Sequence, residues 1–284
     1  MQPKSALDDA LALMRDLRAR CDWDAAQTHE SLRPYLLEEA HETDDAIRSG
    51  DDALLREELG DLLLQVLFHS VLAEERHAFG AHDVANTLVT KMRGRHPHLY
   101  GDGVKEPWER MKASRRHSIV DGLPVHLPAL HRAHRLQERA AGVRFDWPDV
   151  AGPLAKVAEE LAEVTELVTA HPPRIAPSGA PVRDEAHDRL EDELGDLLFS
   201  CVNLCRKAGV HASLALDRAN AKFARRFQAV EALARERGLR VGEVPLDVLD
   251  GLWDEVKAGE SVAARTASGG GAADAGGPAR RSGP

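Results

Sequence analysis

Apolar residues recur at helical spacing along most of this chain. Leu7, Leu11, Met14 and Leu17 are separated by three or four residues, which places them on one face of a helix over residues 6–20. Gly50 ends a later helical pattern, and the aspartates that follow it are suitable N-caps for the next helix. The same reasoning predicts helices over about residues 32–48, 54–75, 82–94, 129–140, 153–170, 184–208, 212–236 and 246–258. We therefore expect an all-α fold.

Two helical regions are separated by an irregular stretch in which Pro107, Pro124 and Pro128 interrupt any helix. Only 4% of the residues are aromatic and 30% are charged, which is typical of helical bundles rather than β-sandwiches. The final residues are rich in Ala, Gly and Ser without apolar periodicity, which predicts a disordered tail. We expect an N-terminal helical domain over residues 1–100, a linker over 101–128, a C-terminal helical domain over 129–258 and a tail over 259–284.

Charge and composition argue against several classes of protein. The net charge is −10 and no basic stripe precedes the C-terminal helices, so we expect no nucleic-acid partner. No apolar stretch approaches the length of a membrane span, and the N-terminus lacks the layout of a signal peptide, so we expect no membrane partner. The three cysteines, Cys21, Cys201 and Cys205, have no disulfide-framework spacing. Free thiols of this kind indicate a reducing cytoplasm.

Each half of the chain contains the same acidic pattern. Residues three or four apart share one face of a helix, so the carboxylates of each pattern can converge from two helices. Ionised groups that converge in this way need neutralisation, and hard oxygen ligands suit Mg²⁺ or Mn²⁺, which also bind substrate phosphates. The first copy consists of Glu38-Glu39-x-x-Glu42 and Glu58-x-x-Asp61, and the second of Glu159-Glu160-x-x-Glu163 and Glu193-x-x-Asp196.

The alternative is that these acids belong to ordinary solvated helix faces. That interpretation is the better one for a single acidic pair, because Glu is a common residue on helix surfaces. It is less favoured for a two-helix pattern that occurs twice, with the acids retained while the loops between them differ in length. Apolar stripes run beside the acids, formed by Leu59, Leu62 and Val66 in one copy and by Leu194, Leu197 and Cys201 in the other. We expect these stripes to face the core and to place the acids at its rim.

A di-iron carboxylate bundle is a second alternative, because Glu38-x-x-His41 has the Glu-x-x-His spacing of such sites. That site requires two such motifs. Ala162 occupies the position of the histidine in the second copy, and both partner motifs end in Asp. The pattern therefore favours Mg²⁺ or Mn²⁺ over iron.

Basic residues complement the acids. Lys156 lies four residues before Glu160 on the same helical face, whereas Tyr35 occupies this position in the first copy. Lys222, Arg225 and Arg226 fall within about one turn of a helix and could hold phosphate groups. Pairing with nearby glutamates would explain the same cluster. Two further candidates for a nucleotide site are Arg189, four residues before Glu193, and Trp253, which either stacks on a base or anchors the last helix.

Together and in order, the motifs of this chain resemble the MazG family of nucleoside triphosphate pyrophosphohydrolases in its two-domain bacterial form. The motifs are CDWDAAQT, PYLLEEAHE, ELGDLLLQV, GRHPHLYG, LPAL, FDW, EELAE, ELGDLLF and NAKFARRF. The resemblance covers about residues 5–257. It implies tandem all-α MazG-like bundles, a homodimer, and Mg²⁺-dependent hydrolysis of nucleoside triphosphates to monophosphate and pyrophosphate. It also implies that the C-terminal copy is the active one, in agreement with the missing lysine of the first copy.

The resemblance assigns roles to individual residues. The metal ligands would be Glu160, Glu163, Glu193 and Asp196, with Glu39, Glu42, Glu58 and Asp61 as the first-copy set. The nucleotide would contact Lys156, Arg189, Lys222, Arg225, Arg226 and Trp253. Apart from the resemblance, the position of Glu159 one residue before the metal ligands makes it the candidate for orienting the attacking water. Two departures from the family pattern are Asp22, where a proline is expected, and a long Pro-rich insertion around 171–183. Because the insertion joins the two metal-bearing helices, it could cover the pocket or alter substrate choice.

Two other functions remain open at this point. A metal-stabilised dimeric scaffold would bind nucleotides or a protein partner without hydrolysing them. An inorganic or polyphosphate hydrolase would use the same metals but would have no need of Trp253 as a base contact.

Overall fold

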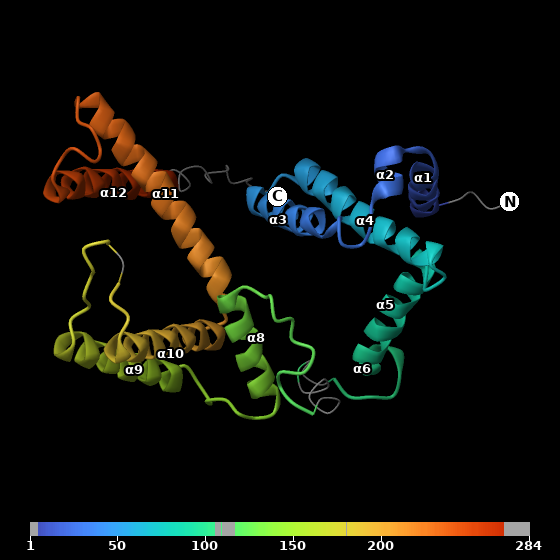
Figure 1. Cartoon of the computed structure of the whole chain (residues 1–284), viewed down its shortest axis with the longest axis horizontal. Helices are drawn as coiled ribbons and strands as arrows, with labels where there is room; N and C mark the ends of the chain where they lie inside the picture. Colours follow the sequence, from blue (N-terminus) through green and yellow to red (C-terminus); the bar gives the residue numbers. More distant parts are fainter. Residues whose placement is uncertain (1–4, 106–108, 110–116, 180, 270–284) are drawn as a thin grey trace, which may run out of the picture. The chain divides into compact units, whose positions relative to one another are not determined.

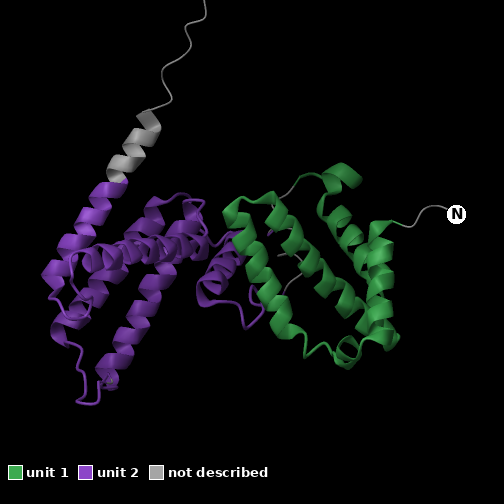
Figure 2. Cartoon of the chain, turned by 90° about the horizontal axis from the view of Figure 1, so that it is seen from above, with its two compact units in different colours: residues 1–108 green, residues 109–284 purple. Residues whose placement is uncertain are grey.

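A computed structural model describes residues 5–105, 109, 117–179 and 181–269 of the chain (Figure 1). The chain divides into two compact units, residues 1–108 and 109–284 (Figure 2). Throughout the described residues the regular elements are helices, and the β pairing is limited to one isolated bridge between Ile175 and Pro181. The all-α prediction is therefore confirmed. None of the described helices combines the length and the apolar character that crossing a membrane requires.

The first unit is organised around the helices α3 and α4, which pack along each other, with α1 against α4. The Ser5 side chain caps α1, and Asp51 Oδ1 accepts hydrogen bonds from the first backbone N–H groups of α4. Gly50 ends α3 with a φ of +71°, the left-handed conformation that glycine adopts without strain. The elements are α1 (Ala6–Arg20), α2 (Asp22–Ala26), α3 (Arg33–Ser49), α4 (Asp52–Glu75), α5 (Ala81–Arg95) and α6 (Pro97–Tyr100).

The core of the first unit lies where α1 meets the C-terminal half of α4. Phe68 is its largest fully buried side chain, with 1% of its surface exposed. Leu11 and Met14 from α1, with Leu67 and Val71 from α4, are in the same buried cluster. Each such side chain contributes about 1.5–3 kcal/mol when fully buried, so this cluster fixes α1 on α4.

The second unit repeats the helix pair and extends it. α9 packs along α10, and α8 crosses α10. The N-terminal end of α11 contacts α8, and α11 also packs against α12. Figure 1 shows α11 leaving the α9–α10 pair at the end of α10 and carrying α12 away from that pair. A second buried cluster, with Val230, Ala234 and Leu252, joins α11 to α12. The elements are α8 (Ala129–Gly142), α9 (Ala151–Ala170), α10 (Glu185–Lys207), α11 (Ala212–Glu236) and α12 (Leu246–Gly269).

The predicted helices are confirmed with small shifts at their ends. The short helices α2 and α6 were not predicted, because neither is long enough to show an apolar period. α12 continues to Gly269, whereas the sequence predicted that order ends near residue 258. The remainder of the predicted tail, residues 270–284, lies outside the described residues.

The prediction that the apolar stripes face a core is wrong for several of their residues within one chain. Leu59 and Leu194, next to the acids of each copy, are 49% and 42% exposed. Val66 is exposed as well, while Leu62, Leu197 and Cys201 are half-buried. A pair of helices has two broad faces, and α8 or α1 covers only part of one of them. The stripe therefore remains available to a further layer of helices.

The Pro-rich insertion lines a hollow that includes none of the clustered acids of its own unit. It connects the end of α9 to the start of α10, and Figure 1 shows it as a long loop that rises away from the α9–α10 pair and returns to it. Arg174 and Asp184 form an ion pair across its base. Its residues line a hollow of about 260 Å³ that also includes His187 and Leu190 from α10.

Candidate functional site

Three carboxylates of the second unit converge between α9 and α10. Glu160 and Glu163 lie one turn apart on α9, and Glu193 faces them from α10, so that one oxygen from each lies within 4.8 Å of the others. Glu160 is buried, with 4% of its surface exposed, while Glu163 is exposed and Glu193 is half-buried. The sequence predicted this group because residues three apart share a helix face and α10 runs along α9.

The ammonium group of Lys156 accompanies the cluster. Lys156 Nζ lies 2.6 Å from Glu160 Oε1 and 2.9 Å from Glu159 Oε1. Hydrogen bonds to Glu160 and then Glu159 raise the pKa of Lys156 far above its usual value. The pKa of Glu163 is also raised, first by desolvation and then by the charges of Glu160 and Glu193, against a smaller opposing effect of Lys156. One cation therefore only partly compensates the three acids.

The donor set fits a divalent cation of the magnesium type. Carboxylate oxygens on two helices provide hard ligands, and the charges of Glu160 and Glu193 add to desolvation in raising the pKa of Glu163, which a bound cation would oppose. Histidine and cysteine, which softer metals prefer, are absent from both described clusters that could hold an ion. A di-iron site, which would need histidine ligands, is therefore not supported by the described residues.

The first unit contains the corresponding cluster, formed by Glu39, Glu42 and Glu58. The pKa of Glu39 is raised, first by desolvation and then by Asp61 and the other two acids. Tyr35, in the place of the lysine, packs edge-on against Trp23 with ring centroids 6.1 Å apart. The two copies thus share the acids and differ in what surrounds them.

Three predicted site residues lie beside the triads rather than within them. Asp196 is exposed on α10 and borders a cavity together with Lys156 and Glu160. Asp61 is near enough to raise the pKa of Glu39. Glu159, the candidate for orienting water, bonds Lys156 and has a 57% exposed side chain.

Lys222, Arg225, Arg226 and Trp253 lie on α11 and α12 and not on the two helices that carry the acids of the second unit. Arg225 and Arg226 form ion pairs with Glu260 of α12, and the Arg226 guanidinium lies 5.9 Å from the centre of the Trp253 ring. Trp253 also packs against Phe223. Lys222 is exposed on α11, and Arg189 is exposed on α10 one turn before Glu193. Figure 1 shows the α11–α12 pair extending away from the α9–α10 pair that carries the acids.

Sequence reasoning missed a cavity of about 510 Å³ between α8, α9 and α10. Lys156, Glu160 and Asp196 form its acidic end. Its apolar walls include Leu136, Phe145, Trp147 and Phe199, and its polar walls include Gln137, Ser200 and Asn203, all three of which are buried. One feature of the sequence could have indicated the cavity. Ser200 and Asn203 lie on the face of α10 that is buried, where apolar residues are usual.

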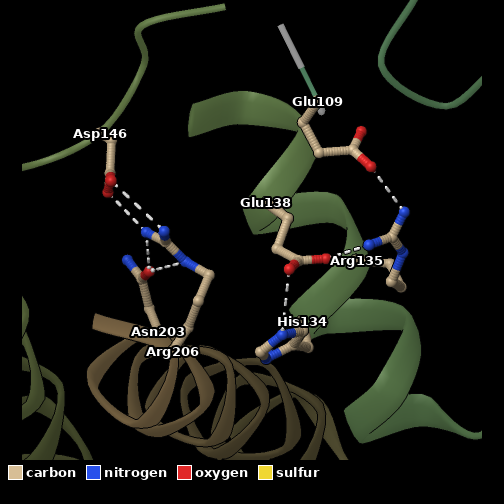
Figure 3. A network of polar contacts seen from close by, with 7 residues as sticks. All are labelled: Glu109, His134, Arg135, Glu138, Asp146, Asn203 and Arg206. Atoms are coloured by element: carbon tan, nitrogen blue, oxygen red, sulfur yellow. Dashed lines mark hydrogen bonds and ion pairs between the residues drawn. The ribbon is translucent and has the colours of Figure 1, made fainter. Parts of the chain in front are cut away.

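A polar network holds the walls of this cavity together (Figure 3). Arg206 of α10 donates hydrogen bonds to both Asp146 and Asn203, and Lys207 Nζ lies 2.9 Å from Asp146 Oδ2. Burial would raise the pKa of Asp146, but the hydrogen bonds from Arg206 and Lys207 outweigh it and hold that pKa below its usual value. The network ties the segment before α9, which carries Trp147, to α10.

A second set of contacts secures α8 (Figure 3). Arg135 pairs with Glu138 and with Glu109, and Glu138 Oε1 lies 3.6 Å from His134 Nε2. Gln137 Nε2 donates a 2.8 Å hydrogen bond to the backbone oxygen of Phe199, which joins α8 to α10. The wall of the cavity is therefore fixed from both helices.

Comparison with known proteins places this geometry in a family. The family model of the MazG nucleotide pyrophosphohydrolase domain matches the chain twice, over residues 27–100 and 152–230. The chain belongs to the MazG family. Each of the two matched segments contains one of the carboxylate triads. The resemblance seen in the sequence motifs is confirmed.

Curated relatives of the MazG family extend along nearly the whole chain. The nucleoside triphosphate pyrophosphohydrolase/pyrophosphatase MazG of Thermotoga maritima is 41% identical over 264 residues, which are 90% of this chain and 97% of that protein. The nucleoside triphosphate pyrophosphohydrolase of Escherichia coli K12 is 40% identical over 266 residues, 88% of this chain and 97% of that protein. A relative of the same name from Mycobacterium tuberculosis is 46% identical over 144 residues, 47% of this chain and 44% of that protein.

Proposed function

We propose that this MazG-family protein hydrolyses nucleoside and deoxynucleoside triphosphates to the monophosphate and pyrophosphate, with Mg²⁺ as its cofactor and Mn²⁺ as a possible substitute. The observation that carries the proposal is the convergence of Glu160, Glu163 and Glu193 within 4.8 Å, with Lys156 next to them. The names of relatives that are about 40% identical over most of the chain support it. The biological role that fits is housekeeping of the nucleotide pool.

The reaction is a displacement at the α-phosphorus. Water forms a new P–O bond, the bond between the α-phosphorus and the bridging oxygen breaks, and pyrophosphate leaves with that oxygen. A divalent cation, when bound, neutralises phosphate oxygens and lowers the pKa of coordinated water. Glu160, Glu163, Glu193 and Asp196 would hold the cation, and Glu159 would accept a hydrogen bond from the attacking water.

The basic residues would stabilise charge on the phosphates. Lys156 already lies at the acidic cluster, where its ammonium group can reach a phosphate oxygen beside the cation. We propose that Lys222, Arg225 and Arg226 reach the phosphates from a second copy of the chain, because their own α11 leads away from the acids. Arg189 and Trp253 remain proposed nucleotide contacts.

A homodimer is supported by the apolar faces of the helices that bear the acids. Leu161 and Leu198 are 53% and 59% exposed on α9 and α10 of the second unit. Leu37 of α3 is exposed in the same way in the first unit. Contiguous apolar faces of this kind mark interaction sites, and two helix pairs that join through them form a four-helix bundle. A cytoplasmic location accords with the three free cysteines.

Product analysis tests the proposal. The purified protein is incubated with ATP or dGTP, with and without Mg²⁺, beside a Glu163→Ala variant, which keeps a good helix former at that position. The expected products are the monophosphate and pyrophosphate, formed only with the cation and lost in the variant. Diphosphate and phosphate as products, or full activity in the variant, would contradict the proposed site. Binding of nucleotide without turnover would support the scaffold instead.

A further inference from the structure

The cavity between α8, α9 and α10 adjoins the acidic cluster and has the properties of a ligand pocket. Its volume of about 510 Å³ lies within the range of about 300–1,000 Å³ that is usual for small-molecule sites. Aromatic and aliphatic side chains form most of the lining, with a few buried polar groups among them. Because Lys156 and Glu160 belong to both the cavity and the acidic site, a ligand can occupy the two together.

Asn203 presents a fixed polar group to this cavity. The residue is only 7% exposed, and its Oδ1 accepts hydrogen bonds of 3.0 and 2.7 Å from Arg206. These bonds settle the orientation of the amide, because a guanidinium can only donate. The amide nitrogen of Asn203 donates to no group in the described part of the chain, so it remains available to an acceptor on a ligand.

Trp147 supplies an aromatic wall of the cavity. A Cβ atom on Gly152 would lie 2.1 Å from the Trp147 ring, so the indole packs directly on the backbone of α9. Asp146, the preceding residue, is bonded to Arg206 and Lys207 and holds the ring in this place. The Trp147 residue as a whole is 40% exposed, so it is not closed off by packing against the helices.

The first unit has the same helix register but fills the corresponding position. Seven residues after Asp196 the chain has Asn203, and seven residues after Asp61 it has Phe68. Phe68 is 1% exposed and belongs to the core of its unit. Tyr35, at the position that corresponds to Lys156, packs against Trp23, the counterpart of Trp147. A buried phenylalanine and a tyrosine thus replace the amide and the lysine of the second unit.

We infer that this cavity receives the base of the nucleoside triphosphate, with Trp147 as the stacking surface and Asn203 as a hydrogen-bond donor to the base. The inference rests on the proposed function, because it requires the triphosphate to lie at the Glu160 cluster. It makes Asn203 a residue that determines specificity, and it restricts base recognition to the second unit. Stacking of one base on an aromatic side chain strengthens binding about 5- to 150-fold.

The test fills the cavity with the residue that the first unit carries. Asn203→Phe places a ring in a space of about 510 Å³ while Arg206 keeps its partner Asp146. Calorimetry with Mg²⁺ present compares the binding of α,β-methylene-ATP with that of inorganic tripolyphosphate, which lacks a base. The wild-type protein should bind the nucleotide at least about 10-fold more tightly than tripolyphosphate, and the variant should lose most of this preference.

Three further variants make the result decisive. Asn203→Ala removes the donor without filling the cavity and should reduce the nucleotide preference by a smaller factor. Ala232→Phe adds the same ring to an exposed position of α11 outside the cavity and should leave the preference unchanged. An unchanged preference in Asn203→Phe, or a preference lost only in Trp253→Ala, would overturn the inference. If the wild-type protein neither binds α,β-methylene-ATP nor cleaves ATP, the proposed function itself fails.

Discussion

Replacement of Arg206 by Met should destabilise the second unit and disorganise the cavity. Arg206 and Asp146 have side chains that are only 12% and 18% exposed, so their ion pair is largely shielded from water. The same guanidinium satisfies Asn203 Oδ1. Methionine keeps the length and apolar character of the side-chain stem, so the change removes the charge and the hydrogen bonds and leaves most of the packing.

The size of the effect follows from what remains after the change. Loss of one partner of a buried ion pair costs about 3–5 kcal/mol when the other charge is left uncompensated. Here Lys207 Nζ, 2.9 Å from Asp146 Oδ2, continues to neutralise part of that charge. We therefore expect the free energy of unfolding to fall by about 1–3 kcal/mol, part of it from the unsatisfied Asn203 oxygen.

Urea unfolding at pH 7, followed by circular dichroism and tryptophan fluorescence, measures this difference. Arg174→Met is the control, because Arg174 pairs with Asp184 at the exposed base of the Pro-rich insertion and should contribute little. Because the pKa of Asp146 is lowered in the folded protein, the stabilisation is complete above its ordinary value of 3.8 and is lost as the pH falls through the folded pKa. A loss at pH 7 no larger than that of Arg174→Met would refute the reasoning.

Three further predictions concern the metal site and pH. Glu163→Gln should reduce kcat/KM for ATP about 100-fold or more, whereas the matched first-unit change Glu42→Gln should retain turnover; equal losses would contradict catalysis by the second copy alone. Lys156→Met removes the cation that compensates Glu160, so saturating Mg²⁺ should raise the Tm of this variant more than it raises that of the wild type, as measured by scanning fluorimetry. The variant should also bind ATP more weakly in calorimetry. An unchanged Mg²⁺ effect on Tm would show that the lysine does not compensate the site. Burial lowers the pKa of His134 below its ordinary value of 6.5, so the free energy of unfolding should decrease as the pH falls below about 6.5. His134→Gln should reduce this pH dependence in urea titrations. Identical pH profiles of variant and wild type would disprove the role of His134.

Local features of the sequence sufficed to predict the helices and the convergence of the acids. Helix caps and spacing act over a few residues, and a face shared by Glu160 and Glu163 follows from the helical period alone. The exposure of Leu59 and Leu194 could not be predicted in this way, because it depends on which helices cover the α3–α4 and α9–α10 pairs.

The cavity lay beyond sequence reasoning for a related physical reason. It exists because α8 crosses α10 at Gln137 and because the segment with Trp147 is tied to Arg206, and both contacts join residues about 60 positions apart. The polar residue at position 203 was visible in the sequence, but its meaning depended on its burial. Once the acids of the two copies are aligned, Phe68 at the matching position shows that the same helix surface can serve as core.

Hydrolysis of ATP in ¹⁸O-labelled water tests the central claim most directly, because it reports which phosphorus atom the water attacks. With Mg²⁺ present, the account predicts that the label enters the phosphate of AMP and is absent from the pyrophosphate, and that Glu163→Gln forms neither product at a comparable rate. Label in the pyrophosphate, or ADP and labelled phosphate as products, would contradict attack at the α-phosphorus.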